Sequence, residues 1–391
     1  MSAIPLLRGF SPGAPIGWRE GRPVSWEHFL AAAVALARRL PNGGRCINLC
    51  DDRLNFILAF AAALIARSTS LLPQSRAPDV LRELARSHEG AIYVADQPIS
   101  IGGDCVQVGV ADWSAREAIQ DMPSLPAEQS AAILFTSGST GAPQAHLKSW
   151  GSLTRASQAA RLRLPLAAGS SLLGAVPAQH MWGFEMTVML SLQAGCAVHS
   201  ACPLLPAEIC AALEQLPGPR WLVATPLHLR ACISSGMRPP AVAGVLCATA
   251  ALPVNVAAAV EQSWHAPLFE IYGSTETGAM AVRRPVRSET FEVLGDIRLQ
   301  TTGAEAVASG GQLDEPVILN DVIALKSERI FTLQGRTADM VKIAGKRASL
   351  AALNMELGRA PGVLDCVYMA REGGPGEPRL CAFAVAPGQT A

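Results

Sequence analysis

Hydroxyl-bearing residues and glycines are concentrated in one short segment that could bind phosphate groups. The segment 136–143 directly follows the apolar run 131–135, which predicts a strand. Glycines let backbone amides turn toward an anion, and serine and threonine hydroxyls donate to phosphate oxygens. Gln144 follows where a Walker A loop would place lysine, so we expect a triphosphate loop of another kind, with a Ser/Gly-rich surface turn as the alternative. The candidate phosphate-binding residues are Thr136, Ser137, Gly138, Ser139, Thr140 and Gly141.

A second polar segment, 272–278, also follows an apolar run, 268–271. A tyrosine at a strand end can stack on a base, and a carboxylate beside phosphates is a natural Mg²⁺ ligand. We therefore expect Tyr272 to contact a base and Glu276 to hold the metal. The alternative is a helix N-terminus, with Ser274 as the cap and Glu276 in the first turn.

The third candidate region combines Asp321 with the charged segment 335–347. A carboxylate at a strand end can accept both hydroxyls of a ribose, and Arg336, one hairpin later, can reach the ribose or a phosphate. Taken alone, each of these residues would be an ordinary solvated surface charge.

The order and spacing of the three segments resemble the adenylate-forming superfamily of acyl-CoA synthetases, aryl-acid and amino-acid adenylation domains, and luciferases. Segment 136–143 is similar to its TSG-S/T-TG-x-P-K-G loop, 272–278 to its YG-x-TE motif, and Asp321 with 335–347 to its TGD and GR-x-D-D-x-x-K pair. The resemblance covers most of the chain. It implies that a carboxylate attacks the α-phosphorus of ATP to give acyl-AMP and pyrophosphate, usually before thioester formation on CoA or on the phosphopantetheine of an acyl carrier protein.

The resemblance also implies roles for individual residues. Thr275 would bind the α-phosphate, Glu276 would hold Mg²⁺, and His180 would orient the acid. His180 lies in the apolar segment 176–183, where a histidine is more often an ordinary core residue, and that alternative stays open. Small residues at 248–250 would leave space beside adenine and the acyl group. The implied ATP- or AMP-binding set is Thr136, Ser137, Gly138, Ser139, Thr140, Gly141, Ala248, Thr249, Ala250, Tyr272, Gly273, Asp321 and Arg336.

The chain departs from the family pattern at several positions. Gln144 and Ala145 replace a lysine and a glycine, so neutralisation of the triphosphate would depend on Mg²⁺ or on Lys148. Ala338 stands where the family has its hinge Asp or Lys, with Asp339 next to it. These departures leave a second hypothesis open: a catalytically impaired nucleotide- or acyl-adenylate-binding homologue that acts as a platform for a partner.

The substrate hypothesis depends on analogy with shorter enzymes. The compact region before residue 136 and the segment 345–350 look similar to short bacterial ligases of aryl-polyene or related pigment pathways. This similarity implies an aryl acid of the hydroxybenzoate or cinnamate type, loaded on an acyl carrier protein or CoA, with a fatty acid as the alternative.

The elements that position these segments follow a βα rhythm, which predicts an α/β fold with mostly parallel sheets. We expect a large core, residues 1–337, made of two βαβ-type subdomains and a small β-rich subdomain from about residue 291. A hinge at Ala338 and Asp339 would lead to a small α+β lid, residues 338–391. We expect this lid to be truncated, because no segment resembling the family's C-terminal catalytic lysine follows. The expected helices include 26–40, 54–67, 77–87 and 349–358.

Composition excludes several classes of protein. Hydrophobic residues make up 50% of the 391 residues, too many for a disordered chain, and 32 Lys plus Arg balance 32 Asp plus Glu. The charge balance gives no field that would hold the chain on nucleic acid or on an anionic membrane. The longest apolar run, 56–66, is too short to span a bilayer, so we predict a buried helix, no membrane insertion and a cytoplasmic location. The ten cysteines form no CxxC pair, which favours buried free thiols.

Overall fold

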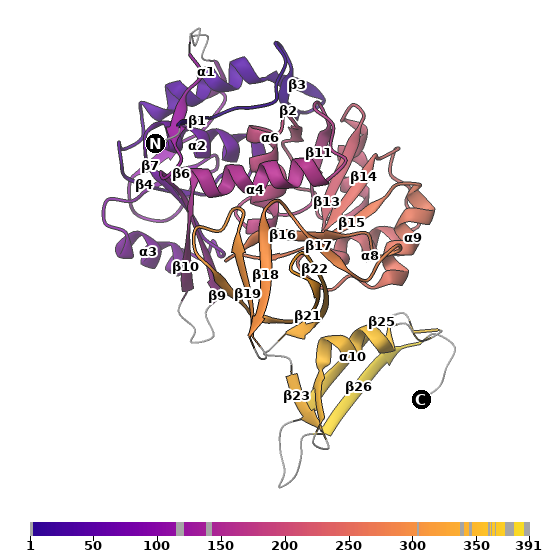
Figure 1. Ribbon diagram of the computed structural model, residues 1–391. Coiled ribbons are helices and arrows are strands. Elements are labelled where there is room, and N and C mark those ends of the chain that lie inside the picture. Colours follow the sequence, from indigo (N-terminus) through magenta and orange to yellow (C-terminus); the bar gives the residue numbers. More distant parts are fainter. Residues whose placement is uncertain are drawn as a thin grey trace.

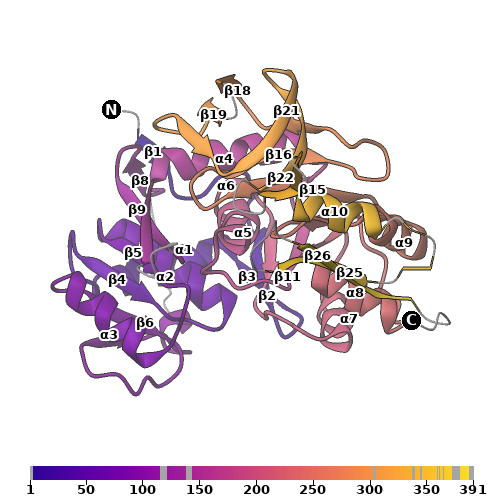
Figure 2. The same ribbon diagram turned by 90° about the horizontal axis from the view of Figure 1, so that it is seen from below.

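Two large sheets with helices between and around them form the body of the molecule (Figure 1). The computed structural model describes residues 3–114, 121–137, 143–302, 305–336, 340–343, 346–358, 360, 362–363, 365–371 and 379–386. In Figure 2 the indigo elements of the first sheet and the pink elements of the second lie side by side, with the orange strands next to both. This is the α/β arrangement that the sequence predicts.

The first sheet has six strands in the order β10-β9-β5-β4-β6-β7. Its strands are parallel except β10, which pairs with β9 as an antiparallel hairpin. The strands are β4 (Arg45–Asn48), β5 (Thr69–Leu72), β6 (Ile92–Ala95), β7 (Cys105–Gln107), β9 (Ser130–Ser137) and β10 (Pro143–Ser149). The helices of this part are α1 (Trp26–Ala37), α2 (Arg53–Ile65) and α3 (Pro78–Ser87), which confirms the predicted helices.

The second sheet has eleven strands in the order β21-β22-β17-β16-β15-β14-β13-β11-β12-β2-β3. Its centre, from β15 to β2, is parallel, and both ends are antiparallel. The strands are β2 (Pro15–Arg19), β3 (Arg22–Ser25), β11 (Ser171–Gly174), β12 (Ala197–His199), β13 (Arg220–Ala224), β14 (Gly244–Cys247), β15 (Leu268–Ser274), β16 (Gly278–Arg283), β17 (Phe291–Val293), β21 (Asp321–Ser327) and β22 (Ile330–Arg336). The accompanying helices are α4 (Trp150–Arg163), α7 (Pro206–Glu214), α8 (Pro226–Ser234) and α9 (Val254–Trp264).

Helix α2 lies between the two sheets. It contacts β4 and β5 of the first sheet and β12 of the second, so the apolar residues on all its sides are buried. A helix that is hydrophobic all round must be covered in this way. The Asp52 side chain caps it by accepting a 2.9 Å hydrogen bond from the Asn55 amide. The buried helix predicted around 56–66 is therefore confirmed.

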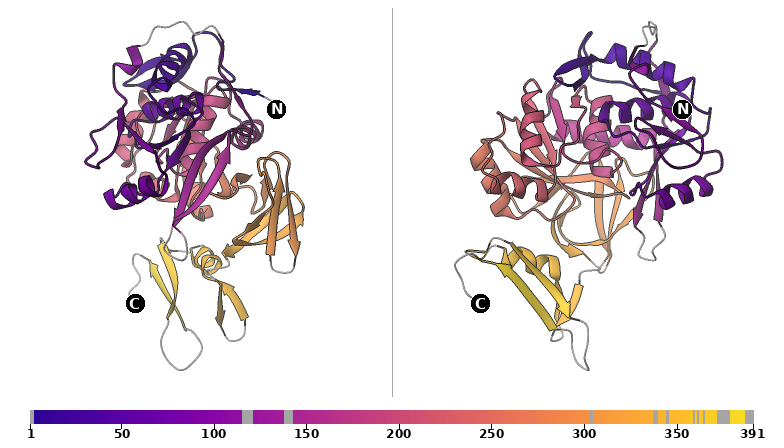
Figure 3. Two further views of the ribbon diagram at one scale, coloured as in Figure 1. Left: turned by 90° about the vertical axis from the view of Figure 1, so that its left-hand side faces the viewer. Right: turned by 180° about the vertical axis from the view of Figure 1, so that it is seen from behind.

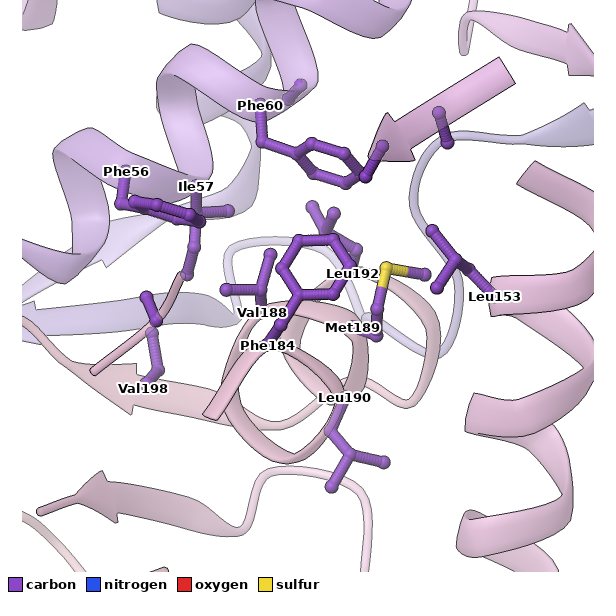
Figure 4. Close-up of a cluster of buried hydrophobic side chains, with 14 of the residues drawn as sticks. Phe56, Ile57, Phe60, Leu153, Phe184, Val188, Met189, Leu190, Leu192 and Val198 are labelled. Carbon is purple, nitrogen blue, oxygen red and sulfur yellow. The ribbon is translucent and has the colours of Figure 1, made fainter. Parts of the chain in front are cut away.

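Aromatic residues join α2 to the segment that follows β11. Phe60 of α2 meets Phe184 edge to face with the ring centroids 5.0 Å apart, at the centre of the cluster in Figure 4. Phe184 begins η2 (Phe184–Met189), one π-helical turn between the short helices α5 (Met181–Gly183) and α6 (Leu190–Gln193). This packing fixes the segment on which His180 and its neighbours stand.

Smaller sheets complete the described part of the chain. The predicted β-rich region supplies β17, β21 and β22 of the second sheet and a separate sheet of β18 (Ile297–Thr302), β19 (Glu305–Gly310) and β20 (Val317–Leu319). The C-terminal elements β23 (Met340–Ile343), β24 (Lys346–Ser349), α10 (Leu350–Leu357), β25 (Asp365–Arg371) and β26 (Arg379–Val385) gather in a small lobe (Figure 3). Strand β1 (Ala3–Pro5) pairs with β8 (Ser124–Pro126). The division at 337/338 stays a prediction.

Two further expectations concern the membrane and the thiols. In the described parts of the chain, no helix is long and apolar enough to cross a membrane. The ten cysteines are free thiols and six of them are buried, as predicted.

Arg53 is a fully buried cation that ties α2 to the second sheet. Its guanidinium donates to Thr187 Oγ1 at 2.7 Å, to the Gly174 carbonyl at 2.9 Å and to the Val176 carbonyl at 2.7 Å. Burial lowers the pKa of Arg53. These bonds hold the end of β11 and η2 in fixed positions, because charge-assisted hydrogen bonds in a dry interior are directional and strong.

Replacing Arg53 with methionine should lower the free energy of unfolding by about 3 kcal/mol, because two carbonyls and a hydroxyl lose their donor. Urea denaturation of the full chain measures this. Arg45→Met is the matched control, since Arg45 is exposed on β4. An equal effect of the two substitutions would contradict the role assigned to Arg53.

Candidate active site

Loops that follow three parallel strands meet at one edge of the second sheet. The segment after β11 carries His180, the one after β14 carries Thr249, and β15 ends in the second predicted loop. In open α/β sheets, ligands bind outside the carboxyl ends of the strands. A cavity of about 200 Å³ opens at this edge. Its lining includes the predicted residues His180, Ala248, Thr249, Gly273 and Thr275.

Thr249 has a strained backbone. Its φ of +85° lies in the left-handed region, which β-branched residues rarely adopt. Such strain costs on the order of 1–3 kcal/mol and is concentrated at functional sites. Thr249 lies in the wall of the cavity and its neighbour Ala250 is exposed, so this turn presents backbone and small side chains to the open space.

The second predicted loop is the turn of a hairpin. Strand β15 ends at Ser274 and β16 begins at Gly278, and the Ser274 amide donates to Thr277 Oγ1 at 3.0 Å. The alternative of a helix N-terminus capped by Ser274 is therefore wrong, because the chain turns back into an antiparallel strand. The turn places Thr275 in the cavity wall and leaves the Glu276 side chain 28% exposed.

The first predicted loop also joins two strands, β9 and β10. Thr136 Oγ1 lies 2.8 Å from His146 Nε2, and the same nitrogen lies 3.7 Å from Glu276 Oε1. His146 thus brings the first and second loops together. Only the backbone of Ser137 is described here. The predicted phosphate-binding residues outside the described part are Gly138, Ser139, Thr140 and Gly141.

Lys148 also joins the first and second predicted loops. The lysine side chain is buried on β10, and its Nζ donates to the backbone carbonyl of Glu276 at 2.6 Å. Burial lowers the pKa of Lys148, while the carboxylates of Glu185, Glu276 and Asp314 act in the opposite direction. Gln144, where the family's loop has a lysine, is exposed. The lysine of the β9–β10 hairpin is Lys148, four residues further along the chain.

The electrostatics keep Glu276 ionised. Burial alone would raise its pKa, but the Ser274 hydroxyl, a backbone amide and the nearby His146 and Lys148 hold the pKa of Glu276 below its ordinary value. Burial lowers the pKa of His146, and Lys148 acts in the same direction, whereas the Glu276 carboxylate opposes them. The Glu276 carboxylate and the Thr136 hydroxyl, which both lie near His146 Nε2, are hard oxygen donors of the kind that Mg²⁺ prefers. Within the described ranges no group of three or more His, Cys, Asp and Glu could hold a metal ion.

The third predicted region lies beside the second. Tyr272 Oη donates to Asp321 Oδ2 at 2.7 Å, and the tyrosine ring packs against Phe331. Asp321 stands directly opposite Arg336 in the β21–β22 pairing. The backbones of the two predicted ribose-binding residues therefore lie side by side on adjacent strands. The hinge candidates Ala338 and Asp339 lie outside the described residues.

Glu185 is a cavity residue that the sequence analysis missed. It stands on η2, only 4% exposed, and its Oε2 accepts a 2.7 Å hydrogen bond from the Ala279 amide. Oε1 has no hydrogen-bond partner in the described part of the chain. Burial raises the pKa of Glu185 to about 7, although the Ala279 amide and Lys148 act in the opposite direction. One signal could have identified it: Glu185 is the only Asp, Glu, Lys or Arg between residues 175 and 192.

Comparisons with known proteins show related sequences and a similar fold. The sequence model of the family described as AMP-binding enzyme matches residues 18–304. A 4-coumarate–CoA ligase of Halorhodospira halophila is 30% identical over 71% of this chain and 70% of its own length. An L-proline–[L-prolyl-carrier protein] ligase of Streptomyces coelicolor is 25% identical over 92% of this chain and 75% of its own. The O-succinylbenzoate CoA synthetase MenE from Bacillus subtilis, solved with AMP, has the same fold, with a TM-score of 0.82, 16% identity and coverage of 100% of this chain and 90% of that one.

The raised pKa of Glu185 predicts a pH-dependent stability. The folded state keeps the proton up to about pH 7, whereas the unfolded state loses it near pH 4.5, so the stabilisation present at low pH is lost as the pH rises through that range. Between pH 4.5 and 8 the wild-type chain should lose about 3 kcal/mol more unfolding free energy than Glu185→Gln, which does not titrate. Urea denaturation at both pH values measures the difference. Equal losses in the two proteins would show that Glu185 is not the titrating group.

Proposed function

The chain belongs to the AMP-binding enzyme family, and from this membership we propose that it activates a carboxylic acid with ATP. The acid would become an acyl adenylate with release of pyrophosphate, and its acyl group would then pass to the thiol of CoA or of a carrier protein's phosphopantetheine. The observation that carries the proposal is the cavity of about 200 Å³ that opens beside Thr275, next to the turn that carries the ionised Glu276.

In the first step a carboxylate oxygen attacks the α-phosphorus, and the bond to pyrophosphate breaks. His180 stands in the cavity wall, and burial lowers its pKa, so it is neutral and can hold the acid by a hydrogen bond. Thr275, also in the cavity wall, would donate to the α-phosphate. When bound at Glu276, Mg²⁺ would offset the negative charge that develops on the departing phosphates.

The nucleoside end would lie beyond the second loop. Tyr272 and Gly273 would border the adenine and Asp321 the ribose hydroxyls, with Arg336 on the neighbouring strand. These residues lie on β15, β21 and β22, and the hydrogen bond between Tyr272 and Asp321 joins β15 to β21, which supports a single extended nucleotide site. We assign the C-terminal lobe, from residue 338 onward, the role of a lid over this edge.

The substrate we propose is an aryl acid. The walls of the cavity include Met181, Trp182 and Ile271, which suit an aromatic ring. A cavity of about 200 Å³ is smaller than the roughly 300 Å³ at which drug-sized ligand sites begin, so a single-ring acid fits better than a long fatty acid. One relative is named as a ligase of 4-coumarate and CoA, and another as a ligase of proline and a carrier protein. Both CoA and a carrier protein are therefore candidate acceptors.

Acid-dependent exchange of labelled pyrophosphate into ATP tests the proposal. The wild-type chain should catalyse exchange with at least one member of a panel of benzoic, cinnamic and fatty acids. Glu276→Ala should reduce exchange at least 100-fold, because the metal loses its protein ligand. Glu292→Ala is the matched control: this glutamate is on the neighbouring β17, pairs with Arg163 at the surface and should leave exchange unchanged.

Two results would contradict the proposal. Exchange that persists in Glu276→Ala would remove Glu276 from the mechanism. ATP binding in calorimetry without exchange for any acid would favour the non-catalytic nucleotide-binding homologue, the hypothesis that the replacement of a lysine by Gln144 left open.

A further inference from the structure

Glu185 adds a carboxyl group to the wall of the cavity, which also contains His180 and Thr275. The carboxylate is held rigidly, because Oε2 accepts the Ala279 amide and Phe184, its neighbour on η2, is locked against Phe60. Gly278 makes room for it: a side chain at this position would collide with Oε1. The remaining oxygen, Oε1, is buried and has no partner among the described residues.

A buried carboxylate oxygen without a donor is costly, and nearly all such atoms in folded proteins are hydrogen-bonded. Glu185 lies in the wall of the cavity that we assign to the acid, so a bound acid is placed to supply the donor. All six residues of η2 are buried, and the five other than Glu185 are uncharged. The folding of η2 therefore does not require a charge at this position.

The charge near Glu185 selects the type of donor. Lys148 lies close enough to affect the pKa of Glu185, so this carboxyl group already has a positive charge near it. A substrate ammonium would be desolvated beside a second cation and would be disfavoured. A neutral hydroxyl is cheaper to bury, and above about pH 7, where Glu185 is ionised, it still donates a charge-assisted hydrogen bond.

We propose that Glu185 is a specificity-determining residue that accepts a hydrogen bond from a hydroxyl on the aromatic ring of the acid. The substrate class is therefore the hydroxyaryl acids, in preference to their unsubstituted parents and to ring acids that carry an ammonium group. This inference rests on the proposed function, because it assigns the cavity to the acid.

The test compares kcat/KM in pyrophosphate exchange at pH 8, where Glu185 is ionised, for matched acids: 3- and 4-hydroxybenzoate against benzoate, 4-coumarate against cinnamate, and 4-(aminomethyl)benzoate as the ammonium probe. The wild-type chain should prefer one hydroxylated acid over its parent by 10- to 100-fold. In Glu185→Leu this ratio should fall to about 1 or below, while exchange with the parent acid persists.

Two further variants test whether a change in the ratio comes from a disturbed fold. Glu185→Gln keeps the shape, but its amide oxygen must face the Ala279 amide, so an NH₂ group points toward the cavity and the ratio should fall at least threefold. Glu270→Gln changes a buried carboxylate that pairs with Arg283 and does not line this cavity, and it should keep the wild-type ratio.

The outcomes separate the two proposals. Exchange with aryl acids at an unchanged ratio in both Glu185→Leu and Glu185→Gln overturns the inference and leaves the proposed function standing. If no acid supports exchange, binding of the acids is measured directly by tryptophan fluorescence. Tighter binding of a hydroxylated acid, lost in Glu185→Gln, would then support the inference without supporting the proposed function. Equal or absent binding of the hydroxylated acids and their parents overturns it, as does a preference for 4-(aminomethyl)benzoate.

Discussion

The arrangement of the candidate site depends on one buried cation, Lys148. A lysine in a dry interior is stable only when acceptors and opposite charges surround it. Lys148 meets this condition by bonding the Glu276 backbone and by lying near the carboxylate of Glu185. The β9–β10 hairpin, the turn between β15 and β16, and η2 are therefore held around a single charge. A shift of any one of these three elements would leave an uncompensated charge in the interior.

The rest of the fold keeps these elements in place. Helix α2 is buried between the two sheets, and Arg53 at its start bonds the chain just after β11. Phe60 packs on Phe184 (Figure 4), so η2 cannot move independently of α2. The cavity wall is thus part of the main core, while the strained turn at Thr249 closes another side. A wall fixed in this way suits discrimination by hydrogen bonding, which requires precise placement of the acceptor.

Sequence patterns predicted the elements better than the contacts between them. The βα rhythm and the three polar segments are local signals, and the structure places Thr275 and Tyr272 at the strand end where they were expected. The pattern of Ser274 and Glu276 fits both a helix cap and a hairpin turn, and only the pairing of β15 with β16 decides between them. Glu185 and His146 escaped notice because their importance comes from residues distant in the sequence, Ala279 and Glu276.

The proposed function requires the acid cavity and the nucleotide loops to form one continuous site. Calorimetric titration with a non-hydrolysable hydroxybenzoyl-sulfamoyl adenosine tests it most directly, because this molecule spans both parts. We expect one molecule to bind per chain, at least 100-fold more tightly than AMP, since the two halves bind without a second loss of translational entropy. An affinity equal to that of AMP would mean that the cavity takes no part in binding the acyl group, and it would contradict the account.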